Sequence, residues 1–316
     1  MKTALICTGI FVPIFIAALL YACYWIYSVA FKSPHKHQNE VMRLPKGFNP
    51  GADEETFLGW IAEMDKIPYE KVQTLSEDGL KLAGRYYHVS DTAPVVICFH
   101  GYRSLPVKDF CGGGILFPEM GYNTLLVYQR AHGDSEGKAI TFGIKERRDC
   151  ICWIKYVISR FGKDVPIMLY GISMGGATVL LASGEADLPK NVKAVVSDCP
   201  YSSPREIIKK VSGDLGFPPN PSFPFVLLAA RIYGGFGLSK ISCVESAKKS
   251  PVPILLIHGE ADDFVPTYMS DTIARDNPNI QYHTFPGASH AVSYASDKER
   301  YVGLVKEFTQ KNLGVC

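Results

Sequence analysis

From about residue 70 onward, short uniformly apolar runs alternate with segments whose apolar residues recur at helical spacing. The apolar runs predict buried strands at residues 95–99, 124–128, 166–170, 193–198, 253–259 and 281–285. Helical patterns lie between most of them, at residues 146–162, 173–183, 267–276 and 296–312. Apolar strands that alternate with amphipathic helices predict an α/β protein with a mainly parallel, doubly wound sheet.

The region before these runs has a different pattern. Residues 71–89 contain two strand-like runs around Glu77-Asp78-Gly79, a turn signal that predicts a hairpin. Residues 53–66 place acidic residues ahead of helically spaced apolar ones and predict a short helix. We therefore expect a linker and short helix over residues 32–69, followed by one domain over residues 70–316.

The N-terminus is apolar throughout. No charged residue occurs from Thr3 to Phe31, and a membrane-spanning helix needs only about 20 apolar residues. We predict an uncleaved transmembrane anchor over residues 1–31. A cleaved signal peptide is the alternative, with Lys2 as its charged start and Ser28-Val29-Ala30 as its cleavage site. Aromatic residues gather at the outgoing end of the run, as expected of a helix that meets the headgroup layer: Tyr21, Tyr24, Trp25 and Tyr27.

Two further features concern the compartment. More basic residues follow the apolar run than precede it, which favours a cytoplasmic domain. Many exported proteins nevertheless begin with one lysine and an apolar span, so the side of the membrane stays open. The chain has nine cysteines, an odd number, and several lie in apolar runs, which predicts free thiols and no disulfide framework.

A long insertion interrupts the alternation of strands and helices. More than fifty residues separate the strand that ends at Asp198 from the strand that begins near Pro253. They include the proline cluster at residues 218–225 and a following apolar run. A segment of this length between two parallel strands predicts an inserted lid, at about residues 200–250, that shapes a substrate pocket.

Composition and charge exclude several classes of function. The 316 residues carry a formal net charge of +2 and contain no basic tract, so no nucleic-acid partner is expected. Histidine, cysteine and acidic residues do not occur at metal-ligand spacing, and nucleotide-binding glycine motifs are lacking from the sequence. We expect no metal and no cofactor, and the oligomeric state stays open.

The segment Gly171-Ile172-Ser173-Met174-Gly175 has the spacing G-x-S-x-G between a predicted strand and a predicted helix. In open α/β sheets, ligands bind beyond the carboxyl ends of the strands. A serine in such a turn is exposed as a nucleophile, and the helix N-terminus favours a developing oxyanion. A structural turn in which Ser173 only caps the helix is the alternative.

Three more motifs follow predicted strands. The segment FHGYR at residues 99–103 predicts an oxyanion hole made by the backbone amides of Tyr102 and Met174. In IHGEADDFVP, residues 257–266, either Asp262 or Asp263 is a candidate acid, and spacing leaves both possible. His290, in FPGASHAVSY, is the candidate general base.

These motifs together resemble the α/β-hydrolase superfamily: GISMGG, FHGY, YQRAHGDSEG, HGEADDFVP and GASH. The similarity spans about residues 70–312 and is greatest to bacterial membrane-anchored or exported hydrolases of the prolyl-oligopeptidase/serine-aminopeptidase-like branch. The resemblance maps the acid onto Asp262, the nucleophile onto Ser173 and the base onto His290. Some members place the acid at the position of Asp198. Ala131 departs from the family, which usually has glycine there.

The resemblance implies a serine hydrolase that cleaves carboxylic esters of a small-molecule acyl substrate through a Ser173-Asp262-His290 triad and an acyl-enzyme. A serine peptidase or an acyl thioesterase on the same fold is the alternative, since the three share this machinery. A third possibility is a non-catalytic binding protein tethered to the membrane. The apolar insertion hints at a hydrophobic acyl chain, but the sequence does not identify the substrate.

Overall fold

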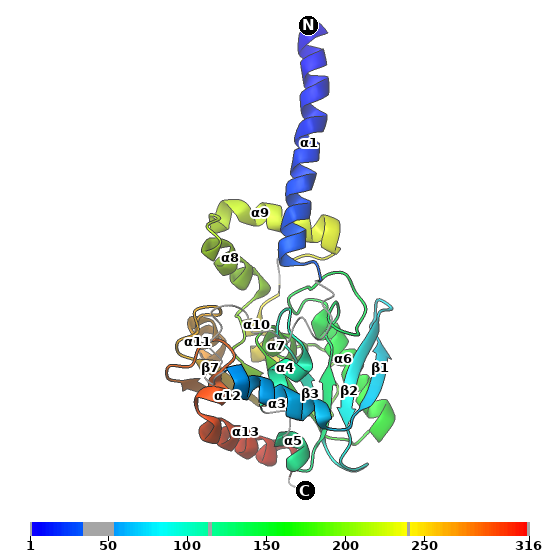
Figure 1. Cartoon of the computed structure of the whole chain (residues 1–316), viewed down its shortest axis with the longest axis vertical. Coiled ribbons are helices and arrows are strands. Elements are labelled where there is room, and N and C mark those ends of the chain that lie inside the picture. Colours follow the sequence, from blue (N-terminus) through cyan, green and yellow to red (C-terminus); the bar gives the residue numbers. More distant parts are fainter. Residues whose placement is uncertain (1, 34–53, 113–115, 239–240, 315–316) are drawn as a thin grey trace.

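Eight strands form one sheet in the spatial order β1-β2-β4-β3-β5-β6-β7-β8 (Figure 1). The computed structural model describes residues 2–33, 54–112, 116–238 and 241–314. Strands β3 to β8 run parallel, and the hairpin of β1 and β2 joins them antiparallel at one edge. The strands are β1 Glu70–Leu75, β2 Lys81–Tyr87, β3 Val95–Phe99, β4 Asn123–Val127, β5 Ile167–Ile172, β6 Val192–Asp198, β7 Ile254–Gly259 and β8 Ile280–Phe285.

All six predicted strands are present, and the predicted hairpin is confirmed. Strand β8 is not buried as predicted, because it forms an edge of the sheet and only Phe285 in it is buried. Along β3, alternate side chains enter two different cores because successive residues of a strand point to opposite faces. Val95, Ile97 and Phe99 belong to one core, whereas Val96 and Cys98 belong to the other. Strands β3, β4, β5 and β7 are buried on both faces and so have no polar face, which explains their apolar runs in the sequence.

Helices cover both faces of the sheet, as the sequence predicts. One face packs against α6 Glu146–Phe161, α7 Met174–Ser183, α10 Cys243–Lys249 and α11 Tyr268–Ala274. The other packs against α3 Glu54–Lys66, α4 Pro106–Phe110, α5 Leu116–Glu119, α12 Ser293–Ser296 and α13 Lys298–Leu313. The short helices α4, α5 and α12 were not predicted, because one turn carries too little periodicity to recognise.

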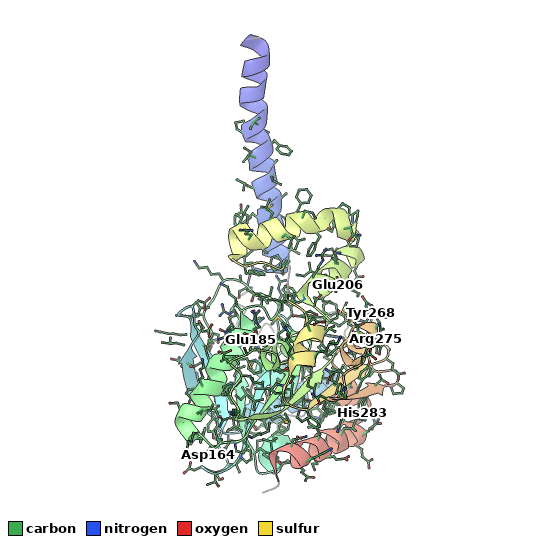
Figure 2. The ribbon with its side chains drawn as sticks, turned by 180° about the vertical axis from the view of Figure 1, so that it is seen from behind. Asp164, Glu185, Glu206, Tyr268, Arg275 and His283 are labelled. Carbon is green, nitrogen blue, oxygen red and sulfur yellow. The ribbon has the colours of Figure 1, made fainter. Side chains whose placement is uncertain are left out.

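The insertion between β6 and β7 is helical. It contains α8 Pro204–Asp214, α9 Pro219–Ala229 and a π-helical turn at Ala230–Gly234. Helix α9 was not predicted because it holds three prolines; two of them lie in its first turn, where no backbone donor is needed. In Figure 1, α9 crosses beside the base of α1, and the view from behind, with Glu206 of α8 labelled below α9, agrees (Figure 2).

Helix α1, Lys2–Ala30, projects away from the sheet domain (Figure 1). Its segment Val12–Ala30 is long and apolar enough to cross a membrane, and no other helix in the described ranges is. Only 11% of this segment is buried, so it does not resemble a core helix. The predicted linker lies mostly in residues 34–53, outside the described residues.

The lower end of α1 is integrated into the domain. Phe31 is fully buried, and its ring contacts those of Phe142 and Phe236 at centroid distances of 5.8 and 5.3 Å. The amide of Ile140 donates a hydrogen bond to the carbonyl of Phe31 at 2.7 Å. Residues just after the helix are therefore held by both packing and backbone hydrogen bonds.

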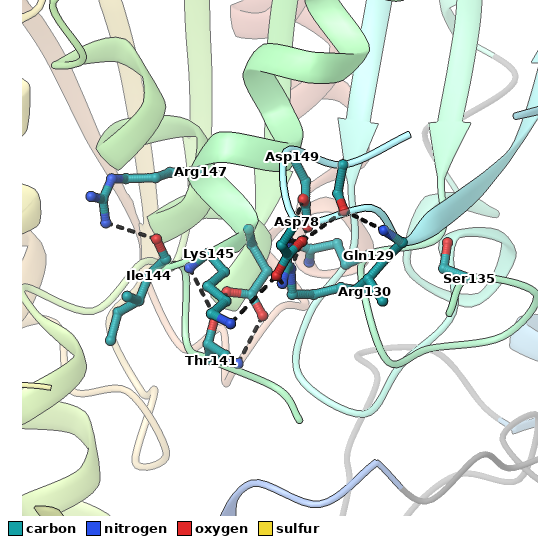
Figure 3. A network of polar contacts seen from close by, with 12 residues as sticks. Asp78, Gln129, Arg130, Ser135, Thr141, Ile144, Lys145, Arg147 and Asp149 are labelled. Atoms are coloured by element: carbon teal, nitrogen blue, oxygen red, sulfur yellow. Dashed lines mark hydrogen bonds and ion pairs between the residues drawn. The ribbon is translucent and has the colours of Figure 1, made fainter. Parts of the chain in front are cut away.

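A buried arginine fixes the loop that follows β4. Arg130 makes paired hydrogen bonds to Asp149 of α6, both 2.6 Å, and to Asp78 of the hairpin turn, both 3.0 Å (Figure 3). Paired guanidinium–carboxylate bonds fix orientation as well as distance. The loop therefore sits rigidly between the hairpin and α6.

The cysteines in the described residues agree with the prediction of free thiols. None of them forms a disulfide, and most are buried. They are Cys23, Cys98, Cys111, Cys150, Cys152, Cys199 and Cys243.

The turn between β5 and α7 leaves no room for a side chain at Gly175. A Cβ there would lie 1.8 Å from the carbonyl oxygen of Phe99. We expect Gly175→Ala to lower the free energy of unfolding by about 3 kcal/mol or more, because backbone must move. Gly303→Ala is the matched control: its site on α13 is exposed and open, so it should stabilise the protein by up to about 1 kcal/mol. Chemical denaturation measures both, and an unchanged stability of Gly175→Ala would contradict the close approach.

Candidate active site

Three predicted side chains from separate loops meet at the carboxyl ends of the strands. Ser173 follows β5, Asp262 follows β7 and His290 follows β8. His290 Nε2 lies 2.9 Å from Ser173 Oγ, and His290 Nδ1 lies 2.7 Å from Asp262 Oδ2. In the tautomer these partners favour, Nδ1–H donates to the carboxylate and Nε2 accepts from the serine hydroxyl.

Ser173 has a strained backbone, with φ 56° and ψ −115°. A positive φ is uncommon outside glycine and marks a turn that the surrounding structure enforces. Its amide donates to the carbonyl of Asp198 at 2.8 Å, and its side chain does not cap α7. The turn therefore presents the hydroxyl to His290, and the helix-capping alternative is wrong.

Asp262 is the carboxylate that reaches the imidazole. Its side chain is fully buried, whereas the neighbouring Asp263 is exposed. The alternative acid Asp198 is also buried, but its Oδ2 accepts a hydrogen bond from the Tyr301 hydroxyl at 2.8 Å. Burial raises the pKa of Asp198 to about 6 despite that bond.

The surroundings keep Asp262 ionised. Burial alone would raise its pKa, but hydrogen bonding with His258 and His290 outweighs burial and holds the pKa below its usual range. The backbone amides of Phe264 and Val265 also donate to Oδ1, at 3.0 and 2.8 Å. A permanently charged carboxylate can orient the imidazole and stabilise its protonated form.

His258 supports Asp262 from behind and was not predicted. Its Nε2 lies 3.2 Å from Asp262 Oδ2 and 2.8 Å from the carbonyl of Val265, and its Nδ1 lies 2.6 Å from Ser270 Oγ. The sequence feature that could have indicated this role is the histidine near the end of the otherwise apolar strand β7. A fully buried polar side chain needs hydrogen-bond partners, and His258 is fully buried.

The FHGYR loop lies against the nucleophile. A Cβ added at Gly101 would lie 3.4 Å from Ser173 Cβ. No hydrogen bond among the described residues uses the amide of Tyr102 or of Met174, the two predicted oxyanion donors. Met174 opens α7, so its amide has no partner within the helix and is available to an anion.

Buried polar groups that were not predicted hold this loop in place. Asp109 accepts from the amide of Gly101 at 2.6 Å and from the Ser104 hydroxyl. His132 Nε2 accepts from the amide of Arg103 at 3.0 Å, and its Nδ1 donates to the carbonyl of Arg130 at 2.9 Å.

Two cavities meet at Ser173. One has a volume of about 380 Å³ and is lined almost entirely by apolar side chains. The other, of about 570 Å³, has polar and charged residues in its lining, including Arg103, Lys108 and Asp263. Ser173, Tyr102 and Phe264 line both cavities. The hydroxyl is thus reached from an apolar side and from a polar side.

One group of potential metal ligands occurs among the described residues: Cys199, Asp262 and His290, with donor atoms within 4.8 Å of one another. Asp262 and His290 already bond to each other. Burial raises the pKa of the Cys199 thiol well above its usual value, so it is not the thiolate that binds metals. This donor set does not fit a metal.

Comparison with protein families decides the classification. Residues 140–316, more than half of the chain, match the prolyl oligopeptidase family. The chain belongs to the prolyl oligopeptidase family. It is a hydrolase with the α/β-hydrolase fold, as the sequence predicts.

Relatives of this family member occur in bacteria and fungi. The Bacillus subtilis (strain 168) protein YqkD is 27% identical over 227 residues, which cover 70% of this chain and 73% of that one. A Saccharomyces cerevisiae membrane protein, YNL320W, is 28% identical over 256 residues, covering 77% and 80%. The Pyrococcus furiosus esterase Pf2001 shares the fold with a TM-score of 0.63 and 23% identity, covering 86% of this chain and 97% of that one.

Stability at acidic pH should depend on His132. Burial, with a smaller contribution from His100, lowers the pKa of His132 to about 3, against about 6.5 in an unfolded chain. Between these values the unfolded chain binds a proton that the folded protein excludes, so this residue's contribution to stability is lost as the pH falls. We expect His132→Asn to have a lower melting temperature than the wild type at pH 7. The difference in melting temperature between the two proteins should become smaller towards pH 4. Melting curves across this range test it, and a constant gap would argue against a buried neutral His132.

Proposed function

We propose that this protein is a serine hydrolase that cleaves carboxylic esters through Ser173, His290 and Asp262. The observation that carries the proposal is the continuous pair of hydrogen bonds from Ser173 Oγ through His290 to Asp262 Oδ2. His290 Nε2 takes the hydroxyl proton as Oγ attacks the acyl carbon. Ionised Asp262 then stabilises the imidazolium.

Charge that develops on the carbonyl oxygen needs donors that are already in place. The amides of Tyr102 and Met174 would supply them, since both border Ser173. The imidazolium of His290 then gives its proton to the departing alcohol oxygen, and Oγ keeps the acyl group. Water, deprotonated by the same imidazole, releases the acid and restores the serine.

The cavities favour an ester with an apolar acyl group. The apolar cavity contains no charged side chain, so it offers nothing to orient a charged peptide terminus. Thioesters remain the second candidate, because a thioester needs the same acyl pocket and the same oxyanion donors. Helix α1 is proposed as a single-pass membrane anchor, supported by its exposed apolar length and by the membrane relative YNL320W.

A fluorophosphonate probe tests the hypothesis that the protein is a serine hydrolase. We expect the full-length protein to be labelled and Ser173→Ala to escape labelling, because only an activated serine reacts with such a probe. Loss of the nucleophile should lower kcat for a nitrophenyl ester by about 10⁶-fold. Thermal melting should show that Ser173→Ala is folded. A folded wild-type protein that takes up no probe would instead favour a non-catalytic binding protein.

The two buried aspartates should differ in their effect on the rate. Asp262→Asn removes the charge beside the imidazole, and we expect kcat to fall by about 10⁴-fold. Asp198→Asn is the matched control, because its amide oxygen can still accept from Tyr301 and because Asp198 does not bond His290. Steady-state kinetics on one ester compares them, and a larger loss in Asp198→Asn than in Asp262→Asn would refute the assigned acid.

A further inference from the structure

The apolar cavity beside Ser173 has α1 as one of its walls. Ala22, Trp25, Ile26, Val29 and Ala30, all from the last turns of the helix, line it. Residues of helices α8 and α9 also line the cavity, as do Ser173 and Met174. The segment that projects from the domain thus also encloses the space next to the nucleophile.

Hydrogen bonds join the end of α1 to the loop that borders Ser173. The Tyr102 hydroxyl donates to the carbonyl of Ala30 at 2.9 Å, and Arg103 Nη2 donates to the carbonyl of Val29 at 2.7 Å. The last carbonyls of a helix lack partners within the helix, and a cation near them is favourable. The same loop therefore completes the helix end and carries the predicted oxyanion amide of Tyr102.

The length of α1 places the cavity at the membrane surface. Its 29 residues extend about 43 Å at 1.5 Å per residue. A hydrocarbon core of about 30 Å needs about 20 of them. Val12–Ala30 is itself apolar enough to span, but the aromatic residues at the end of α1 favour a spanning stretch ahead of Ala22, with Ala22 to Ala30, which contributes to the cavity, at the interface. Aromatic residues typical of the interface, Tyr24 and Trp25 among them, lie in this stretch.

The cavity reaches the surface at this level. Trp25 of α1 and Phe217, which precedes α9, meet edge to face with ring centroids 6.0 Å apart. Both line the cavity, and their exposed fractions are 47% and 44%. Helix α9 contains no charged residue and exposes Phe225. An acyl chain in the part of the bilayer next to the domain would therefore contact apolar side chains at the opening of the cavity.

The polar cavity lies on the other side of Ser173, among residues of α3, α4 and the loop after β8. Helices α3 and α4 lie farther from α1 than do α8 and α9, which line the apolar cavity (Figure 1). A lipid with its tail towards the bilayer and its polar end away from it would fit both cavities without turning over.

We propose that the substrate is an acyl ester of a membrane glycerolipid, whose acyl chain enters from the bilayer between α1 and α9. This inference rests on the proposed ester hydrolysis. The acyl carbon forms a bond with Ser173 Oγ, the bond to the glycerol oxygen breaks, and that oxygen takes the proton from His290 Nε2. Water then releases a free fatty acid and restores Ser173.

Chain-length dependence provides the first test. The measurement is kcat/KM of the full-length protein in detergent on nitrophenyl esters with acyl chains of two to sixteen carbons. Each methylene buried is worth about 0.8 kcal/mol, or about fourfold in kcat/KM. We expect kcat/KM to rise until the cavity is full. Reconstituted into palmitoyl-oleoyl phosphatidylcholine vesicles, the protein should release free fatty acid, measured by mass spectrometry, and Ser173→Ala should release none.

Two valines on α1 provide a matched pair. Val29 lines the cavity, whereas Val12 does not, and their exposed fractions are 41% and 49%. We expect the Val29→Trp side chain to fill the cavity, so that several methylenes of a long acyl chain can no longer be buried there. The ratio of long-chain to short-chain kcat/KM should therefore fall by about tenfold or more. Val12→Trp should leave the ratio as in the wild type.

The outcomes separate this inference from the proposed function. Fluorophosphonate labelling with activity on short esters alone would overturn the lipid substrate and leave the ester hydrolase standing. Absence of both labelling and ester hydrolysis would overturn both. Fatty-acid release from an S-palmitoylated peptide but not from vesicles would overturn the lipid in favour of a protein thioester. An equal ratio in Val29→Trp and Val12→Trp would remove α1 from the acyl pocket.

Discussion

The backbone of α7 touches the end of β3, where Gly175 lies against the carbonyl of Phe99 and leaves no space for a Cβ. This contact draws the helix N-terminus in beside the FHGYR loop and leaves Ser173 with a positive φ. The hydroxyl is thereby held within reach of His290 and between the two cavities. Only glycine at position 175 lets α7 approach the sheet closely enough to position the site, since any side chain would separate the helix from the sheet.

Near this turn, several buried polar side chains hydrogen-bond to backbone groups of the surrounding loops. His100 donates to the carbonyl of Gly101 and accepts from the amide of Gln129, and burial lowers its pKa to about 4. His132 and Asp109 hold neighbouring amides of the same loop. Neutral histidines with both nitrogens occupied position the backbone firmly, so little reorganisation is needed when charge develops at the site.

The sequence predicts where the strands lie, because burial on both faces of the central strands demands apolar runs, and it predicts that the motif residues come close together, because each motif follows one of the strands. Sequence spacing does not distinguish the two adjacent aspartates Asp262 and Asp263. The difference in their burial distinguishes them, and that difference depends on tertiary packing. His258 and Asp109 act through contacts that exist only in the folded chain. An apolar helix has the same composition whether it faces lipid or a cavity, so the contribution of α1 to the cavity could not be predicted.

Phe31 is locked in the core and the carbonyls of Val29 and Ala30 are bonded to the loop beside Ser173, so α1 has little freedom to tilt relative to the domain. In a bilayer, this rigid joint would hold the nucleophile at one height above the hydrocarbon. The enzyme would then select esters by their depth in the membrane. An ester whose carbonyl lies at the height of Ser173 along the membrane normal would be attacked. A chemically identical ester that lies deeper in the bilayer or farther out in the water would not be hydrolysed.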